Sequence, residues 1–452
     1  MTHLNAVKFI SNSKKTAKSE LLSARLSYLS SLLGDPHKRL NYIRLAGSNG
    51  KTICSAMLSS VLSEAGYSVC TLNMSLMSDP MENIRYNTAP ISIPEFTELV
   101  DELHSACNRM KKNIELAKAS MGEDGEPTEE FATVPRSLIE SYPTSADVSC
   151  GELLLLTALM LCRKRSCKIC LIESDHNGPD PSLFLKPPFA ALICGAIPSN
   201  DKSQTAKIKS YIQKGINEVI SAPQDTYAYK IISDACASVN CRLTVPIRSS
   251  LTVNQLSLLG TVFTYNEERF RLSLCGRFQT VNAITVIEAV KMLRRYGYNI
   301  SPEAEMKGLK NVRLPSRFEV LSVNPTVIAD STYKNEAVEP VCESLFDFSE
   351  VTGRYISLCL PCERKLIESY LNMLGARGYK IEKIYTVSPD EEQALANLEG
   401  LPEKASLVVF PTVKSATRQI MSTLKYEDNL LISGDSAFTD KLRFEIMRYL
   451  DF

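Results

Sequence analysis

Residues 47–52 form a short glycine-containing segment whose residue types are those of a phosphate-binding loop. The glycines let backbone N–H groups turn inward, the lysine supplies a mobile ammonium, and the threonine hydroxyl can bind Mg²⁺. The alternative is a tight turn that ends in a surface lysine. The six positions are Gly47, Ser48, Asn49, Gly50, Lys51 and Thr52.

The elements on either side of this segment favour the phosphate-binding interpretation. An apolar run over 42–46 predicts a strand, apolar residues at helical spacing predict a helix from 51 to 65, and SVCTLN at 68–73 predicts the next strand. Gly66 ends the helix. The loop therefore stands at the N-terminus of a helix in a βαβ unit, where the partial positive charge of the helix end attracts anions.

The rest of the first 300 residues continues this alternation. Ser92 and Glu95 have the spacing of a capping box before a helix that reaches Ile114. We expect a polar surface excursion over 119–149, then a helix at 152–164, strands at 168–174 and 190–197, and a polar helix through Lys207 to Ile220. The sequence therefore predicts an α/β domain with a mostly parallel sheet.

A second domain is expected after about residue 300. Alternating residues around 266–268 predict a hairpin, a helix is expected at 280–296, and Ser301 with Pro302 predicts another helix start. Beyond it, five apolar runs alternate with helices: TVIAD, YISLCLP, KIEKIYTVS, SLVVFP and NLLISGD. We predict domains at 1–300 and 301–452, the second a smaller Rossmann-like α/β domain.

Composition excludes several classes of protein. The 452 residues carry 51 Lys+Arg and 51 Asp+Glu, so no global basic field favours nucleic acid or anionic lipid. Apolar runs are too short for a membrane span and the N-terminus lacks a signal-peptide core, so we expect a soluble, cytoplasmic protein. We expect a monomer, although the sequence does not fix the oligomeric state. The 14 cysteines include the pairs Cys167/Cys170 and Cys359/Cys362. A metal or redox role is possible for each pair, but packing is the expected role.

Several segments together resemble the folylpolyglutamate synthase/dihydrofolate synthase family of the Mur ligase superfamily. The stretch from Leu26 to Thr52 resembles the start of these proteins, including their shortened phosphate loop. Five further segments keep the family order: MENIRYNTAPISIPEF, SCGELLLLTALML, GRFQTVNA, VRLPSRFEV and ISGDSAFTDKLR. Because they span nearly the whole chain, the resemblance implies a P-loop domain of the Mur ligase type and ATP-dependent amide ligation.

The resemblance also implies roles for the phosphate loop and the residues near it. Lys51, with the loop amides, matches the positions that hold the ATP phosphates, and Thr52 matches a position near Mg²⁺. Glu173, at the end of KICLIE, matches a metal-ligating glutamate, and Ser75 matches a metal-binding serine after the second strand. A strand's carboxyl end is where α/β sheets bind ligands; a solvated strand-end residue is the alternative for Glu173.

Four more positions receive roles in the same way. Lys214, in IQKGI, resembles the lysine that is carbamylated and becomes an anionic metal ligand; an exposed helix lysine is the alternative. Asn282, Arg317 and Asp330 match positions that handle adenine, phosphate and ribose, although a helix-start Asn, a loop Arg and a strand-end Asp are also ordinary structural residues.

The chain departs from the family pattern where a second metal would be held. The segment GAIPSND at 195–201 has no histidine, and Phe278 stands where the family has one. The family's glycine-rich loop becomes ESDHNGPDPS, in which His176 or Asp175 could compensate, although an exposed loop residue is the expected interpretation. The segment DSTYKN at 330–335 is closer to the pattern of peptidoglycan-building relatives.

Three functions are compatible with these residues. The first is a ligase that uses ATP and Mg²⁺ to add glutamate to a folate-type γ-carboxylate through an acyl phosphate. The second is amide ligation with another carboxylate acceptor. The third is a nucleotide-binding protein that has lost catalysis and acts on a partner. The first two imply small-molecule substrates, with no nucleic acid or membrane involved.

Overall fold

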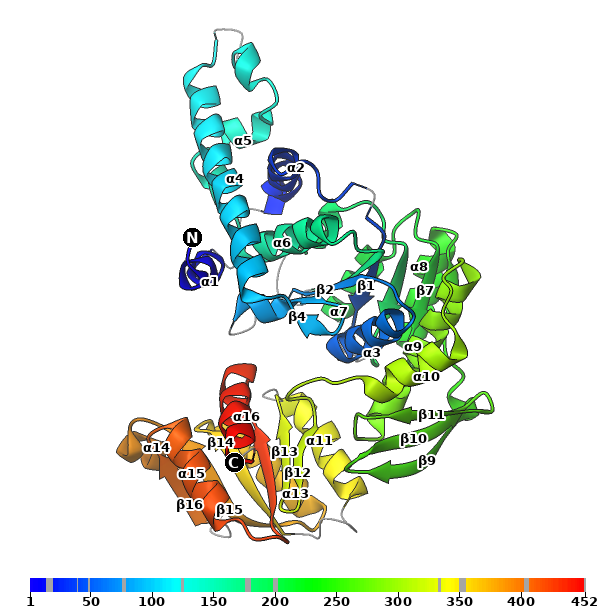
Figure 1. Ribbon diagram of the computed structural model, residues 1–452, viewed down its shortest axis with the longest axis vertical. Helices are drawn as coiled ribbons and strands as arrows, with labels where there is room; N and C mark the ends of the chain where they lie inside the picture. Colours follow the sequence, from blue (N-terminus) through cyan, green and yellow to red (C-terminus); the bar gives the residue numbers. More distant parts are fainter. Residues whose placement is uncertain are drawn as a thin grey trace. The chain divides into compact units, whose positions relative to one another are not determined.

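The computed structural model describes the backbone of residues 1–13, 19–38, 40–47, 49–74, 79–122, 126–174, 180–197, 202–331, 335–348, 355–401 and 406–450. The chain divides into two compact units (Figure 1). Unit 1 comprises Met1–Arg248 and Asn282–Gly308, and unit 2 comprises Ser249–Val281 and Leu309–Phe452. Two of the unit boundaries lie inside helices. The boundary at 281/282 lies in α9 (Phe278–Arg295), and the boundary at 308/309 lies in α10 (Pro302–Asn311).

Unit 1 is built on an eight-stranded sheet with the order β4-β3-β2-β5-β1-β6-β7-β8. The strands β2, β5, β1, β6, β7 and β8 pair in parallel, in that order. Strands β3 and β4 add an antiparallel edge beside β2. The strand bounds are β1 Tyr42–Ala46, β2 Val69–Asn73, β3 Ile84–Tyr86, β4 Ala89–Pro90, β5 Ile169–Glu173, β6 Ala190–Ile193, β7 Glu218–Ser221 and β8 Arg242–Thr244. The carboxyl ends of the parallel strands therefore meet at one edge.

Helices cover both faces of this sheet. On one face, apolar residues of β2 and β5 pack with α1, α2, α4, α5 and α6, and those of β6 and β7 pack with α7 and α8. Helix α3 contacts β1, β2 and β5. The bounds are α1 His3–Ser11, α2 Leu22–Leu32, α3 Lys51–Glu64, α4 Ile93–Ala119, α5 Arg136–Glu140, α6 Cys150–Lys164, α7 Lys202–Tyr211 and α8 Thr226–Ser238.

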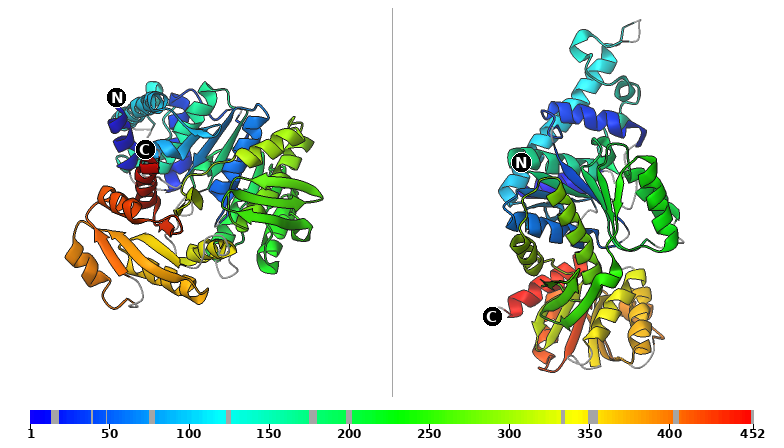
Figure 2. Two further views of the ribbon diagram at one scale, coloured as in Figure 1. Left: turned by 60° about the horizontal axis from the view of Figure 1, so that its bottom comes forward. Right: turned by 90° about the vertical axis from the view of Figure 1, so that its right-hand side faces the viewer.

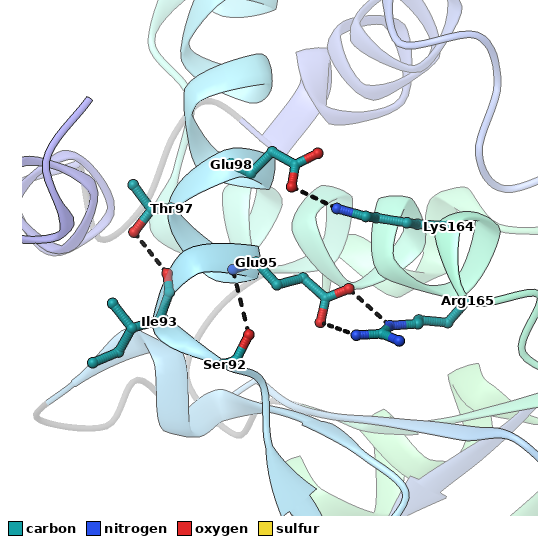
Figure 3. A network of polar contacts seen from close by, with 7 residues as sticks. All are labelled: Ser92, Ile93, Glu95, Thr97, Glu98, Lys164 and Arg165. Carbon is teal, nitrogen blue, oxygen red and sulfur yellow. Dashed lines mark hydrogen bonds and ion pairs between the residues drawn. The ribbon is translucent and has the colours of Figure 1, made fainter.

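The long helix α4 is joined to the end of α6 by two ion pairs (Figure 3). Arg165 donates to both carboxylate oxygens of Glu95 at 2.8 and 3.0 Å, and Lys164 pairs with Glu98 at 2.6 Å. Ser92 caps α4 through the Glu95 amide, as predicted. The Glu95 side chain, however, pairs with Arg165; the charged partner from another helix replaces the reciprocal bond of a capping box.

Two features of unit 1 differ from the sequence-based expectation. The predicted surface excursion contributes to the core, because Leu138 and Ile139 of α5 are buried beside α4. Figure 2 shows this segment packed along the projecting part of α4. The helix predicted through Ile220 ends at Tyr211, and β7 begins at Glu218. The apolar spacing of this stretch fits a helix followed by a buried strand as well as one helix.

Unit 2 contains a six-stranded sheet with the order β12-β13-β17-β14-β15-β16. Its strands are β12 Glu319–Val323, β13 Thr326–Asp330, β14 Tyr355–Pro361, β15 Lys380–Val387, β16 Ser406–Phe410 and β17 Asn429–Ser433. Helices α11 Asn335–Asp347 and α13 Arg364–Ala376 cover one face. Helices α15 Val413–Thr423 and α16 Ser436–Leu450 cover the other, and α14 is Glu391–Asn397. All pairs except β12–β13 are parallel.

A three-stranded antiparallel sheet also belongs to unit 2. It consists of β9 Leu251–Ser257, β10 Gly260–Tyr265 and β11 Glu268–Leu272, and the β10–β11 connection confirms the predicted hairpin. Leu258 and Cys275, from this region, pack in the same core cluster as Val341 and Leu358. The division into compact units is therefore not the single boundary at 300/301 that the sequence suggested, since residues 249–281 belong to unit 2.

Candidate nucleotide and metal site

The phosphate loop joins the carboxyl end of β1 to the first turn of α3. Gly47 and Gly50 have φ values of 124° and 79°, which favour glycine because a side chain would be strained there. The Lys51 ammonium donates to the Gly47 carbonyl at 2.8 Å, and its side chain is largely buried. Lys51 is thus held across the loop, from the first residue of α3 to the first glycine. Ser48 lies outside the described residues.

The connection after β6 packs directly against this loop. A Cβ atom on Gly47 would lie 2.1 Å from the Cys194 carbonyl oxygen, and one on Gly195 would lie 2.8 Å from the Asn49 carbonyl oxygen. The Cys194 amide also donates to the Ala46 carbonyl at 2.7 Å. Only glycine permits backbones to approach so closely, so Gly47 and Gly195 allow the phosphate loop to pack against the segment that follows β6.

Thr52 and Glu173 come together at the carboxyl ends of β1 and β5. The Thr52 hydroxyl donates to Glu173 Oε2 at 2.8 Å, and the Glu173 side chain is almost fully buried. A carboxylate and a hydroxyl are hard oxygen donors, and Mg²⁺ binds through one or two carboxylates plus substrate phosphates. The donor set therefore fits Mg²⁺ beside the phosphate loop. Ser75, the third predicted ligand, lies outside the described residues.

Arg85 is a residue near this site that the sequence analysis missed. It lies on β3, where partial burial lowers the pKa of its guanidinium while the carboxylates of Glu82 and Glu173 oppose that shift. Arg85 is therefore a cation within electrostatic reach of Glu173. Arg85 belongs to the family-like segment MENIRYNTAPISIPEF. That segment contains several polar residues, so the sequence did not single out Arg85 among them.

Asn282, on α9, lies next to the phosphate loop. A Cβ atom on Gly50 would be 2.7 Å from Asn282 Oδ1, and the Cys54 thiol is 3.9 Å from the same oxygen. The structure thus brings this predicted nucleotide-binding residue to the loop, although the two are more than 200 positions apart in sequence. The Asn282 side chain therefore leaves no room for a side chain at position 50.

A buried arginine on β1, Arg44, anchors the short helical turn Pro181–Phe184. The Arg44 guanidinium donates to the Ser182 carbonyl at 3.0 Å and to Tyr42 Oη at 3.3 Å, and it lies 5.0 Å from the Tyr211 ring centroid. Asp180 caps this turn through the Ser182 amide at 2.8 Å. Burial raises the pKa of Tyr42 to about 12, and the Arg44 charge opposes this rise.

In unit 2, Arg317 and Asp330 lie together at the end of β13. Asp330 Oδ2 accepts the Phe318 amide at 2.7 Å, and Arg317 Nη1 donates to the Ser331 carbonyl at 3.3 Å. Ser316 and Phe318 have positive φ values of 53° and 50°. Positive φ at two non-glycine residues is strained, and strain of this kind clusters at functional sites.

The structure does not bring Lys214 to the phosphate loop. It is exposed in the connection between α7 and β7, and its neighbour Gly215 packs against Pro187, which precedes β6. This is the amino edge of the parallel sheet, whereas the phosphate loop follows the carboxyl end of β1. Asp175 and His176 lie outside the described residues, and Phe278 begins α9.

In chemical terms, unit 1 offers a cradle for polyphosphate and an oxygen-rich cation position next to it. Lys51 and the start of α3 supply positive charge, and Thr52 and Glu173 supply the oxygen donors. Such a site can bind and orient a nucleoside triphosphate and stabilise charge that develops on a transferred phosphoryl group.

Comparison with known proteins gives relatives along most of the chain, although no family model matches. The dihydrofolate synthase/folylpolyglutamate synthase of Bacillus subtilis is 27% identical over 339 residues, which is 71% of both chains. A probable bifunctional folylpolyglutamate synthase/dihydropteroate synthase of Haloferax volcanii is 26% identical over 334 residues, 71% of this chain and 36% of that longer protein.

Solved structures of the same kind match the whole fold. The folylpolyglutamate synthase of Thermotoga maritima has a TM-score of 0.75 at 19% identity and covers 98% of this chain and 96% of its own. The Mycobacterium tuberculosis folylpolyglutamate synthase complexed with ADP has a TM-score of 0.76 at 15% identity, with 98% of each chain covered.

The chain has an α/β fold with a phosphate-loop-like segment between β1 and α3, and this fold is shared with solved folylpolyglutamate synthases. In sequence, the chain is similar to dihydrofolate synthase/folylpolyglutamate synthases at 22–27% identity over 64–73% of its length. No helix among the described residues is long and apolar enough to cross a membrane.

Proposed function

We propose that the chain adds L-glutamate to the γ-carboxylate of a folate and converts ATP to ADP and inorganic phosphate in the same reaction. The observation that supports this most directly is the contact between Thr52 and Glu173 at the phosphate loop, 2.8 Å long. It joins a nucleotide cradle to a cation position, in a chain that resembles folylpolyglutamate synthases over 71% of its length. The substrates are small molecules.

The chemistry follows from the low reactivity of a carboxylate toward an amine. The ATP γ-phosphoryl group is transferred to a carboxylate oxygen, which forms an acyl phosphate and ADP. The glutamate amine then attacks the acyl carbon, an amide bond forms, and inorganic phosphate leaves with the carboxylate oxygen. Thr52 and Glu173 would hold Mg²⁺, which would neutralise part of the phosphate charge.

The protein's own residues bind and orient the reactants in this scheme. Lys51 and the amides at the start of α3 hold the ATP phosphates, and Asn282 lies against Gly50 of the same loop. In unit 2, Arg317 and Asp330 are the residues we assign to phosphate and ribose. Arg85 offsets part of the negative charge around Glu173.

Release of ADP by the full-length protein tests this function. We expect release to require ATP, Mg²⁺, tetrahydrofolate and glutamate together, with an amide product visible by mass spectrometry. Lys51→Ala should weaken ATP binding by about 10- to 100-fold, because hydrogen bonds to charged groups contribute about 1.5–3 kcal/mol. Lys230→Ala, which removes an exposed lysine on α8, is the matched control.

Two outcomes would contradict the proposal in different ways. Turnover with another carboxylate and amine, but not with folates, would select a ligase with a non-folate acceptor. Tight ATP binding without ligation of any acceptor would select a protein that has lost catalysis. The segment GAIPSND, which lacks the family histidine, makes both outcomes worth measuring.

A further inference from the structure

Four cysteines gather behind the nucleotide site, on the face of the sheet covered by α6. The sulfur atoms of Cys70, Cys162 and Cys170 all lie within 4.8 Å of one another, and all three side chains are buried. Cys167 is partly exposed and belongs to the turn between α6 and β5. The sequence pattern alone favoured simple packing for Cys167 and Cys170, and the proximity of Cys70 and Cys162 was not visible in it.

Backbone geometry accounts for each position in this cluster. Cys70 on β2 and Cys170 on β5 are register partners in adjacent parallel strands, so their side chains lie side by side on one face. Cys162 lies in the last turn of α6, which packs on that face. Three thiols from three separate elements therefore converge on one point.

The turn after α6 brings Cys167 toward Cys162. The Cys167 amide donates to the Cys162 carbonyl at 2.9 Å, the Ser166 amide donates to the Arg163 carbonyl at 3.2 Å, and Ser166 has a φ of 49°. These are the two hydrogen bonds of a Schellman motif, which places the side chains of its first and last residues in contact. Here those residues are Cys162 and Cys167.

The same turn is fixed from outside by the ion pairs in Figure 3. Lys164 and Arg165, which lie between the two cysteines, bind Glu98 and Glu95 of α4. Arg165 also lies 5.2 Å from the centroid of the Tyr86 ring on β3. The thiols are thus held on elements with few degrees of freedom, which favours ligand binding because little ordering remains to be done.

We propose that Cys70, Cys162, Cys167 and Cys170 form a structural site for one zinc ion. Zinc binds four thiolates as a tetrahedron with Zn–S bonds of about 2.3 Å, which sets sulfur–sulfur distances of about 3.8 Å. The three buried sulfurs lie within 4.8 Å of one another, so small side-chain adjustments bring them to that spacing. Binding forms four Zn–S bonds and releases the thiol protons to solvent. Partly exposed Cys167 provides the side from which the ion enters.

The position of this site gives it a function in the fold. Cys170 precedes Glu173 by three residues on β5, and Cys70 precedes Asn73, the register partner of Glu173, by three residues on β2. An ion at the cluster would cross-link β2, β5 and α6 just behind the strand ends that carry the cation position. The zinc site therefore fixes the elements that position Glu173 without taking part in ligation.

Zinc titration of the full-length, chelator-treated and reduced protein tests the site. We expect about one tightly bound zinc per chain after desalting, measured by mass spectrometry of the metal, and a higher Tm with zinc than without. Cobalt(II) in place of zinc should give thiolate-to-metal absorption in the near ultraviolet. Cys359→Ala, which removes a fully buried thiol on β14 of unit 2, should bind zinc like the wild type.

Cluster variants decide whether these four thiols are the ligands. Cys70→Ala/Cys170→Ala should lose the tight zinc, the cobalt absorption and the zinc-dependent rise in Tm. Cys167→Ala changes a partly exposed turn residue, so it should fold normally and bind zinc at least about tenfold more weakly. Wild-type zinc binding that persists in the double variant, or cobalt absorption absent from the wild type, would overturn the proposal. None of these readouts depends on ligase activity.

Discussion

The buried ion pair between Arg25 and Glu152 makes a strong prediction about the stability of unit 1. Both side chains have no exposed surface. Glu152 accepts from Arg25 Nε at 2.7 Å and Nη2 at 3.1 Å, and from the Ser149 amide and hydroxyl at 2.8 and 2.6 Å. The same carboxylate thus neutralises a buried arginine and closes the capping box of α6.

Glu152→Gln removes the charge while keeping the shape of the side chain. Breaking a buried ion pair in this way costs about 3–5 kcal/mol, because the remaining charge is left uncompensated in the interior. Against a total stability of about 5–15 kcal/mol, this is a large loss. For a unit of this size, 3 kcal/mol corresponds to a fall in Tm of about 6–12 °C. Urea unfolding, followed by circular dichroism, measures the difference.

Glu98→Gln is the matched control, since it makes the same chemical change in an ion pair whose glutamate side chain is 66% exposed. Its cost should stay below about 1 kcal/mol. The double variant Arg25→Met/Glu152→Leu removes both charges and should unfold at a higher urea concentration than Glu152→Gln. Equal urea midpoints for Glu152→Gln and Glu98→Gln would refute the reasoning, because they would mean that burial of the pair contributes nothing.

Three other perturbations have clear expected results. Gly47→Ala should abolish ATP binding measured by calorimetry, because its Cβ would lie 2.1 Å from the Cys194 carbonyl oxygen; wild-type affinity would contradict the loop geometry. Tyr42 has a pKa raised from 10.0 to about 12 by burial, so its contribution to stability is complete below pH 10 and is lost as the pH rises toward 12. Tyr42→Phe should therefore lose less stability than the wild type between these pH values, and parallel curves would exclude the effect. Asp330→Ala leaves the buried Phe318 amide without its acceptor and should lower the free energy of unfolding by about 1–3 kcal/mol, whereas Asp435→Ala, at an exposed helix cap, should cost about 1 kcal/mol.

Features set by neighbouring residues could be predicted from sequence. The βαβ unit around the phosphate loop is confirmed, with β1, α3 and β2 close to their expected bounds. Ser301 caps α10, as its hydroxyl accepts the Ala304 amide at 3.1 Å. Asn266 and Glu267 form the hairpin turn with φ values of 49° and 69°. Each of these depends on local backbone preference or on apolar spacing, which a single sequence displays directly.

Features that depend on distant residues could not be predicted in the same way. Arg85 comes within electrostatic reach of Glu173 because only β2 separates β3 from β5, an order that only the assembled sheet reveals. The thiols of Cys70 and Cys162 come together because α6 packs on β2. Family resemblance supplied Glu173 and Asn282, both of which the structure places at the loop. Lys214 is not brought to the loop, since it lies between the end of α7 and the start of β7, at the amino edge of the sheet.

The interleaving of the two units along the chain has a consequence for biosynthesis. Strands β1 to β8 are synthesised first, but unit 1 also includes residues 282–308. These residues are synthesised only after the three-stranded sheet of unit 2. That sheet in turn shares a core with strands near the C-terminus. Neither unit can therefore complete its core while the other is still entirely inside the ribosome. Since domains generally fold as units during synthesis, newly made chains should expose apolar surface until translation is nearly finished and should depend on chaperones during that interval.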